Sequence, residues 1–156
     1  METRRQIALA TLVAFLLSQL SKFAVIDGLN LREVFEIKVF PPLLTFRMGW
    51  NEGVNFGLFS DANARWILVA VALALVGAIY VWLMREKPGR IGALSGGILI
   101  GGALSNVADR LLYGAVADFL NVSCCGISNP FIFNVADIAV FAGAAGLILF
   151  TGSKKP

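Results

Sequence analysis

Four long apolar runs constrain this chain more than any other feature. They cover residues 7–25, 66–84, 91–108 and 135–152, and each is 18 or 19 residues long. A helix rising about 1.5 Å per residue needs about 20 residues to cross a hydrocarbon layer of about 30 Å. Other backbone forms would leave polar groups unpaired in lipid. The sequence therefore predicts an α-helical polytopic membrane protein with four transmembrane helices.

The composition supports a membrane protein and excludes several kinds of chemistry. Hydrophobic residues make up 58% of the chain and charged residues 15%, against roughly 45–50% and 25% in a soluble domain. The chain has no histidine, which excludes Ser-His-Asp and Cys-His catalysis and the usual zinc-protease motif. We therefore expect no metal site and no cofactor. The net charge of +3 is small and scattered, so we expect no nucleic-acid partner.

Basic residues near the ends of the runs predict the orientation. Arg4 and Arg5 precede the first run, and Lys154 and Lys155 follow the fourth. The turn between the second and third runs contains Arg85, Lys87 and Arg90. Cytoplasmic loops carry the excess of Lys and Arg in membrane proteins. We therefore expect both termini in the cytoplasm and the two long connections, residues 26–65 and 109–134, on the outer side.

The start of the chain has a second interpretation. Arg4 and Arg5 followed by an apolar run also resemble a cleavable signal sequence. Because no A-x-A-like cleavage site follows and Lys22 interrupts the expected region, we interpret this run as a retained helix.

The outer connections show strand-like alternation. Apolar and polar residues alternate over residues 35–39 and again over 44–48, on either side of Pro41 and Pro42. This period-two pattern predicts a small antiparallel β element at the membrane surface. No internal repeat divides the chain, so residues 1–156 are expected to form a single domain.

Three of the four runs carry polar residues at a similar depth. Lys22, Asn106 and Asp137 each lie about 22 Å from the cytoplasmic end of their run at about 1.5 Å per residue. Arg110 follows Asn106 by one helical turn. The second run contributes no polar residue to this layer, and we expect its role to be structural.

This layer admits a structural and a chemical interpretation. In the structural interpretation, Asp137 pairs with Lys22 or Arg110 and holds helices together. Alternatively, the apolar stretch 116–120 reaches back to the bilayer surface and brings Asp118 close to Asp137. Two close carboxylates share a proton, which leaves one base to activate water and one acid to protonate an amide.

Two further features are expected to be structural. Cys124 and Cys125 are adjacent, and because neighbouring Cα atoms lie only about 3.8 Å apart, a disulfide between them would be strained. We therefore expect two unpaired thiols. The glycines of the third run are expected to permit close helix packing, and residues 51–53 (Asn-Glu-Gly) read as a turn.

Four motifs together resemble one family. They are NEGVNFG at residues 51–57, SNVADR at 105–110, VADF at 116–119 and FNVAD at 133–137. Their order and the four-helix pattern resemble bacterial lipoprotein signal peptidase, signal peptidase II. The resemblance implies an aspartyl peptidase of the bacterial inner membrane, with its active site at the periplasmic face. Its partners would be membrane lipids and a prolipoprotein substrate, cleaved before a diacylglyceryl-modified cysteine. We expect it to be a monomer.

The resemblance also implies roles for individual residues. Asp118 and Asp137 match the catalytic pair of the family. The residues that match positions for substrate binding or site support are Asn51, Gly53, Phe56, Gly57, Asn106, Asp109, Arg110, Asn134, Gln19 and Lys22.

Three positions depart from the family pattern. Ser105 replaces the Gly of G-N-x-x-D-R, and Asn55 replaces the Ala of N-x-G-x-A-F-G. Ser18 replaces the Asp of D-Q-x-x-K and leaves Lys22 without an acidic neighbour on its own helix. Since an Asp at position 18 would give Lys22 an i, i+4 partner, the sequence alone favours faster cleavage by the variant Ser18→Asp. If the rest of the site has adapted to Ser18, the added negative charge would instead slow the reaction at neutral pH.

Two other functions remain open at this stage. A small ion- or proton-coupled transporter would also carry intramembrane Asp and Lys, although no polar relay continues toward the cytoplasm. A non-catalytic lipoprotein-binding relative would tolerate loss of Asp118, whereas a peptidase would need both carboxylates.

Overall fold

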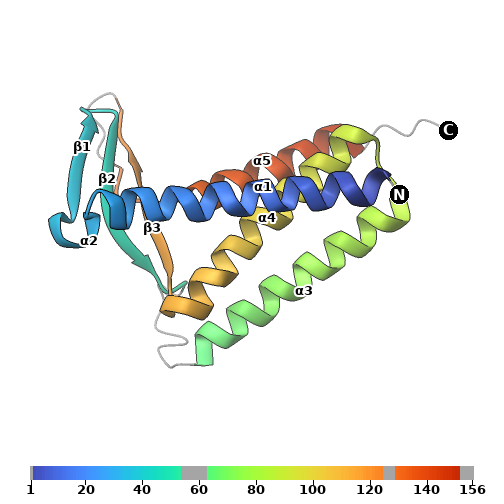
Figure 1. Ribbon diagram of the computed structural model, residues 1–156, viewed down its shortest axis with the longest axis horizontal. Helices are drawn as coiled ribbons and strands as arrows, with labels where there is room; N and C mark the ends of the chain where they lie inside the picture. The colour runs from blue at the N-terminus through green and yellow to red at the C-terminus, as the bar shows by residue number, and fades with distance from the viewer. Residues whose placement is uncertain (1, 54–62, 125–128, 152–156) are drawn as a thin grey trace.

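A computed structural model describes residues 2–53, 63–124 and 129–151. Its long helices lie side by side and a small sheet covers one end of them (Figure 1). The elements, in chain order, are α1 (Glu2–Lys22), the π-helix η1 (Phe23–Gly28), α2 (Leu31–Val34), β1 (Glu36–Phe40), β2 (Leu44–Asn51), α3 (Asn63–Glu86), α4 (Arg90–Tyr113), β3 (Val116–Val122) and α5 (Val135–Thr151).

All four apolar runs form helices, although their ends differ from the predicted ones. Three candidate membrane spans are long and apolar enough to cross a bilayer: Glu2–Gly28, Arg65–Glu86 and Arg90–Tyr113. The apolar helix α5 is shorter, with 17 residues. The third run was predicted to end at residue 108, but α4 continues to Tyr113, where Gly114 adopts a φ of 86° and caps it. The longer α4 carries its last polar residues up to the sheet.

Helix α4 is the centre of the bundle, because α1, α3 and α5 all pack against it. Its glycines allow this close approach. A Cβ at Gly97 would lie 2.6 Å from the carbonyl oxygen of Ile7, and one at Gly102 would lie 2.5 Å from that of Ala136. Gly96 receives the fully buried side chain of Leu83 from α3. The prediction that these glycines serve packing is confirmed.

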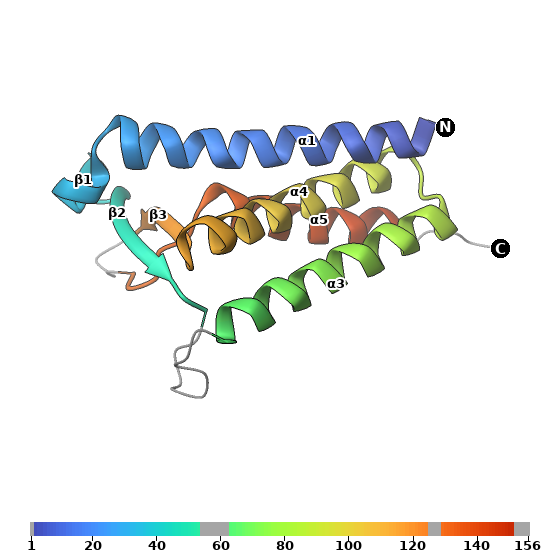
Figure 2. The ribbon, with the colours of Figure 1, turned by 60° about the horizontal axis from the view of Figure 1, so that its bottom comes forward.

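The two ends of the molecule carry different structural elements. The start of α1, the connection between α3 and α4 and the end of α5 lie at one end, and the sheet lies at the other (Figures 1 and 2). The described basic residues of the predicted cytoplasmic side therefore share one end, as expected. Lys154 and Lys155 lie outside the described residues.

The three-stranded antiparallel sheet has the order β1-β2-β3. Strands β1 and β2 confirm the two predicted segments. The third strand was not predicted: residues 116–120 were expected to reach back to the bilayer surface, but they pair with β2, and Asp118 lies opposite Gly49. Residues 116–119 are all buried, so they lack the alternation by which a half-exposed strand is recognised.

Cys124 corrects another expectation. It is disulfide-bonded, whereas the sequence led us to expect an unpaired thiol. The one other cysteine of the chain, Cys125, lies outside the described residues.

Candidate active site

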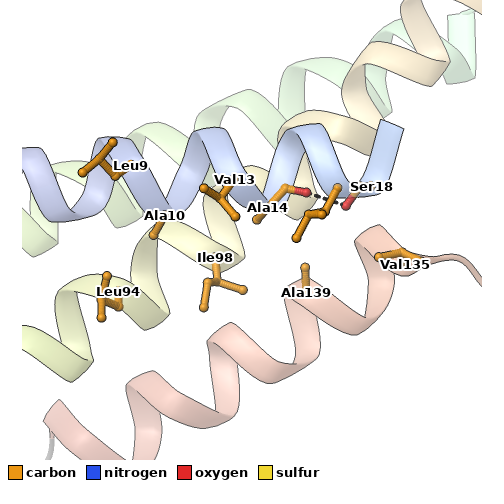
Figure 3. A pocket seen from close by; sticks show the side chains of 10 residues that line it. Leu9, Ala10, Val13, Ala14, Ser18, Leu94, Ile98, Val135 and Ala139 are labelled. Atoms are coloured by element: carbon orange, nitrogen blue, oxygen red, sulfur yellow. Dashed lines mark hydrogen bonds between the residues drawn. The ribbon is translucent and has the colours of Figure 1, made fainter. Parts of the chain in front are cut away.

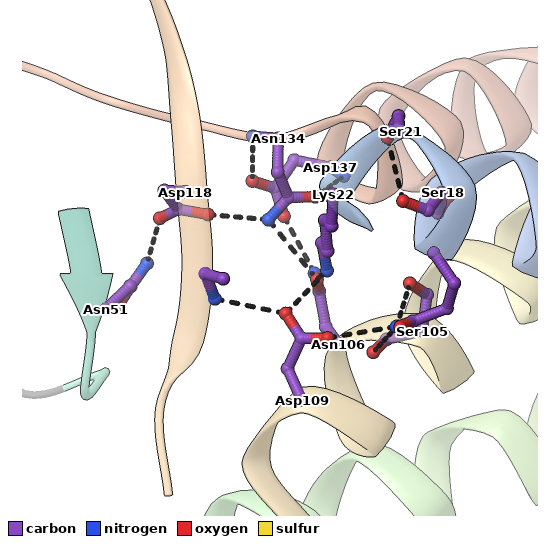
Figure 4. Close-up of polar contacts among 12 residues, drawn as sticks. Ser18, Ser21, Lys22, Asn51, Ser105, Asn106, Asp109, Asp118, Asn134 and Asp137 are labelled. Carbon is purple, nitrogen blue, oxygen red and sulfur yellow. Dashed lines mark hydrogen bonds and ion pairs between the residues drawn. The ribbon is translucent and has the colours of Figure 1, made fainter. Parts of the chain in front are cut away.

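The polar residues at the sheet end form one connected network, which begins with a buried ion pair (Figure 4). Lys22 Nζ of α1 lies 2.6 Å from Asp109 Oδ2 of α4, and the two side chains are 6% and 0% exposed. Gln19 donates to Asp109 Oδ1 at 2.9 Å, and the backbone N–H of Ala117 donates to Asp109 Oδ2 at 3.0 Å. Asp109 is thus paired with a cation and bonded through both oxygens.

Lys22 also belongs to the predicted polar layer. Its Nζ donates to Asn106 Oδ1 at 3.3 Å, and Asn106 Nδ2 donates to Asp137 Oδ1 at 2.8 Å. The prediction that Lys22, Asn106 and Asp137 lie at one depth is therefore confirmed. The simple ion pair of Asp137 with Lys22 or Arg110 is not found among the described residues, because Lys22 pairs with Asp109 instead.

Asp137 is held at the start of α5 by a local motif. Asn134 precedes the first residue of this helix, and its side-chain Oδ1 accepts a hydrogen bond from the backbone N–H of Asp137 at 3.1 Å. In return, Asp137 Oδ2 accepts one from the backbone N–H of Asn134, also at 3.1 Å. This reciprocal arrangement is a capping box, which satisfies N–H groups that a helix start leaves free. The spacing of residues 134–137 thereby fixes the direction of the Asp137 carboxylate.

Asn134 also connects the two candidate carboxylates. Its Nδ2 donates to Asp118 Oδ1 at 2.6 Å and to Asn106 Oδ1 at 3.3 Å. One residue thus contacts Asp118 with its side-chain amide and Asp137 with its backbone N–H. Asp118 and Asp137 come from a strand and a helix that are separate in the sequence, and Asn134 holds them at a single site.

Asp118 is held from its other side by β2. Asn51 Nδ2 donates to Asp118 Oδ2 at 3.1 Å, while Asn51 Oδ1 accepts a hydrogen bond from the backbone N–H of Gly53 at 2.9 Å. This is the predicted turn, and Gly53 adopts a φ of 83° that favours glycine. A Cβ at Gly53 would also lie 2.5 Å from Leu68 of α3. The turn therefore orients the amide of Asn51 toward the carboxylate.

Burial changes the acidity of Asp118, whose residue is 3% exposed. The pKa of this carboxyl is raised from 3.8 to about 6, chiefly by loss of solvent and also by the nearby Asp137. Hydrogen bonds from Asn134 and Asn51 and the charge of Lys22 oppose the shift. Asp118 consequently binds a proton at a higher pH than an ordinary aspartate does.

Arg110 supplies a second positive charge. It lies in the last turn of α4 and interacts electrostatically with Asp118, Asp137 and Asp109. No ion pair within 4.0 Å joins Arg110 to a described carboxylate. Its charge therefore acts on the site from a greater distance than that of Lys22.

The structure brings together ten of the twelve residues that the sequence singled out. They are Asp118, Asp137, Asn51, Gly53, Asn106, Asp109, Arg110, Asn134, Gln19 and Lys22. Phe56 and Gly57, like the departure at Asn55, lie outside the described residues.

Two serines behave differently from each other. Ser105 accepts hydrogen bonds from Gln19 Nε2 on both its hydroxyl and its carbonyl oxygen, at 3.0 and 3.1 Å. It therefore belongs to the network, although the sequence marked it only as a departure. Ser18 is completely buried and donates to the carbonyl oxygen of Ala14 in its own helix at 2.7 Å. Its hydroxyl does not join the network.

The site contains the groups needed for acid–base chemistry on an amide. Within residues 2–53, 63–124 and 129–151, no cluster of three His, Cys, Asp or Glu residues is arranged to hold a metal ion. The site contains two linked carboxylates, two nearby cations and several amide groups. Such a set can activate water and stabilise developing negative charge.

Comparison with known proteins identifies the family. The family model described as signal peptidase (SPase) II matches residues 10–152. The lipoprotein signal peptidase of Methylorubrum extorquens (strain PA1) is 41% identical over 143 residues, which are 90% of this chain and 82% of the relative. That of Pseudomonas aeruginosa (strain UCBPP-PA14) is 33% identical over 142 residues, covering 89% of this chain and 83% of the relative.

A solved structure supports the fold. It is described as a bacterial membrane enzyme, and it superposes with a TM-score of 0.81 at 21% identity, covering 96% of this chain and 94% of that one. The family model covers nearly the whole chain, and the curated relatives match over most of their own length. This chain belongs to the signal peptidase II family.

Proposed function

We propose that this membrane protein is an aspartyl endopeptidase that removes the signal peptide from prolipoproteins, cleaving before a diacylglyceryl-modified cysteine. Membership of the signal peptidase II family supports the reaction. The observation that carries the mechanism is the bridge made by Asn134, which contacts Asp118 and Asp137 together. An acid and a base are thereby held at one site.

The two carboxylates take different roles in this proposal. Asp118, with a pKa raised to about 6, holds the shared proton and donates it to the carbonyl oxygen or to the leaving nitrogen. Asp137 takes a proton from the attacking water. The water oxygen bonds to the carbonyl carbon, the C–N bond breaks, and the amine leaves with the donated proton. Lys22 and Arg110 offset the negative charge that gathers around the reaction.

The remaining residues support this chemistry. Asn51 contacts the substrate backbone as well as Asp118, and Gly53 holds the turn that orients Asn51. Phe56 and Gly57 are assigned to substrate binding or site support by the family motif alone. Asn106 positions Asp137. Gln19 and Asp109 hold Lys22 in place.

The proposed topology follows from the ends of the molecule. Residues 1–156 form one domain with four membrane spans, α5 being the fourth. The termini lie in the cytoplasm and the sheet lies at the periplasmic face of the inner membrane. Because α1 supplies Lys22 and Gln19 to the network, a retained first helix is part of this proposal. We propose a monomer, because the residues of one chain are sufficient to form the described network.

A direct test is to incubate the purified protein with a diacylglyceryl-modified prolipoprotein and to follow the size of the product on a gel. We expect a shift to the size of the mature lipoprotein. The variant Asp118→Asn is the matched control, because it keeps the shape of the side chain. Binding of the prolipoprotein without cleavage would support the non-catalytic relative instead.

The transporter hypothesis finds little support. All buried ionisable side chains among the described residues, namely Lys22, Asp109 and Asp118, lie at the sheet end. An ion or proton pathway would need such groups along the length of the bundle.

A further inference from the structure

An apolar groove runs along the bundle from the middle of α1 toward the candidate site. It lies between α1 and α5, with α4 as its floor, and has a volume of about 470 Å³. Leu9 and Val13 line it on α1, Ile98 on α4 and Ala139 on α5 (Figure 3). The groove forms because α1 and α5 both pack along α4 and touch each other much less.

One end of this groove adjoins the catalytic network. Ser18 and Val135 line that end. Ser18 lies one helical turn before Lys22, and Val135 directly follows Asn134, the residue that bridges the two carboxylates. A molecule lying in the groove would thus end beside Asp118 and Asp137.

The lining suits a hydrocarbon chain rather than a peptide in an extended form. Ser18 is the one lining residue with a polar side chain, and its hydroxyl donates to the carbonyl oxygen of Ala14. An extended peptide would therefore leave its backbone N–H and C=O groups unpaired in this groove, which is unfavourable in an apolar environment. An acyl chain has no such groups.

The size of the groove argues against a helix as its occupant. An α-helix with side chains is about 10–12 Å across, so three turns fill more than about 1,200 Å³. The groove offers about 470 Å³. A single flexible hydrocarbon chain fits such a volume much better.

We propose that this groove binds one acyl chain of the diacylglyceryl group of the substrate and so places the lipidated cysteine next to the two carboxylates. The inference rests on the proposed function, since it concerns the substrate of that same site. It assigns α1 and α5 a role in recognising the lipid, in addition to supplying polar residues.

A second groove provides the control. It lies on the other side of α1 and has a volume of about 430 Å³, with Leu12, Phe15 and Tyr80 among its lining residues. None of its lining residues comes from α5, the helix that begins beside Asn134, whereas Val135 and Ala139 of α5 line the first groove. Leu12 and Val13 are neighbours with exposed fractions of 52% and 53%, yet each lines a different groove.

The experiment compares Val13→Trp with Leu12→Trp. Each variant is given prolipoproteins whose diacylglyceryl group carries either two 16-carbon or two 8-carbon acyl chains, and kcat/KM is measured for each substrate. We expect Val13→Trp to lower kcat/KM about tenfold for the long-chain substrate and less than about twofold for the short-chain one. Leu12→Trp should change both by less than about twofold. Thermal unfolding of both variants, with the milder Val13→Phe as a second filling variant, reports on folding.

Three outcomes would overturn the inference. An equal loss for both substrates would indicate that the signal-peptide helix occupies the groove. No loss for either substrate in Val13→Trp and Val13→Phe would indicate that only bulk lipid fills it. A similar loss in Leu12→Trp would show that the effect is not specific to this groove. Absence of cleavage by the unmodified protein would refute the proposed function itself, and the unmodified protein is measured first for that reason.

Discussion

The site contains two pairs of charged side chains that the fold treats in opposite ways. Lys22 and Asp109 have opposite charges, lie 2.6 Å apart and are almost completely buried. Asp118 and Asp137 have like charges and are linked by the amide and backbone of Asn134. The first pair is neutral as a unit, and both Asp109 oxygens are already bonded. In our proposal the second pair shares a proton that can be exchanged.

We infer from this difference that the Lys22–Asp109 pair supports the structure and that the Asp118–Asp137 pair is available for chemistry. A buried ion pair with complete hydrogen bonding resists change, because removing one partner leaves an uncompensated charge. Two carboxylates held by amides are positioned equally firmly, but an amide donor does not neutralise them. The fold thus pairs Asp109 with a cation and uses neutral amides to hold the two carboxylates that we propose to be catalytic.

The largest expected effect comes from removing either reactive carboxylate. Asp118→Asn and Asp137→Asn should each lower cleavage by about 10³-fold or more, because an amide cannot exchange the proton. Both proteins should remain folded in the membrane. Prolipoprotein cleavage and thermal unfolding would be measured together, and substantial turnover by either variant would contradict the assignment of the pair.

Variants at Asn134 can separate its two roles, which are to cap α5 and to donate a hydrogen bond to Asp118. Asn134→Ala should lower cleavage about 100-fold and destabilise α5 by about 1 kcal/mol, because it removes both the helix cap and the contact with Asp118. Asn134→Ser keeps an oxygen that can cap the helix but lacks the amide that donates to Asp118. Serine should therefore restore the thermal stability and leave cleavage slow. If serine restored both, the contact with Asp118 would be unimportant.

Changes to the ion pair of Lys22 and Asp109 should affect the stability of the protein more than the rate of cleavage. Lys22→Met leaves Asp109 buried without its cation and should destabilise the protein by about 3–5 kcal/mol, with cleavage about tenfold slower. The double variant Lys22→Met with Asp109→Asn removes both charges and should be more stable than the single variant. Thermal unfolding of the single and double variants measures this, and equal stability would show that the pair is not coupled.

Removing the hydrogen bond from Asn51 should shift the pH profile of cleavage as well as lower the rate, because Asn51 also contacts the substrate in our proposal. In our proposal Asp118 donates a proton, so kcat/KM falls as the pH rises through the pKa of Asp118, which is about 6. Asn51, Asn134 and Lys22 lower that pKa, and burial and Asp137 raise it. Asn51→Leu removes one lowering contact, so the falling limb should move to higher pH. A shift to lower pH would exclude this role for Asn51.

Ser18→Asp should have the smallest effect, and here the structure changes the expectation from the sequence. An acidic neighbour was expected to speed cleavage by giving Lys22 a partner. Lys22 is already paired with Asp109 from α4, and position 18 is completely buried. The desolvation of a second carboxylate there offsets much of what an i, i+4 pair with Lys22 would contribute. We now expect a change of less than about threefold in cleavage at neutral pH. A tenfold increase would show that position 18 limits this enzyme.

The sequence by itself determined the parts of this protein that depend on local pattern. Run length predicted the helices, alternation predicted β1 and β2, and helical spacing predicted that Lys22, Asn106 and Asp137 share one layer. The resemblance of four motifs selected the residues of the site. The extent of each helix or strand, and the position of each polar residue along its run, depend on residues that are close in the chain. Periodicity and length are sufficient to predict such features.

Only the tertiary structure decided which partner each polar group has. The pairing of Lys22 with Asp109, the bridge from Asn134 to Asp118 and the entry of residues 116–122 into the sheet all join segments that are distant in the sequence. Several carboxylates lay within the reach of Lys22 on sequence grounds alone. The close packing of α1 on the glycines of α4 brings Asp109 to it, because a buried charge must find a partner where the backbones meet.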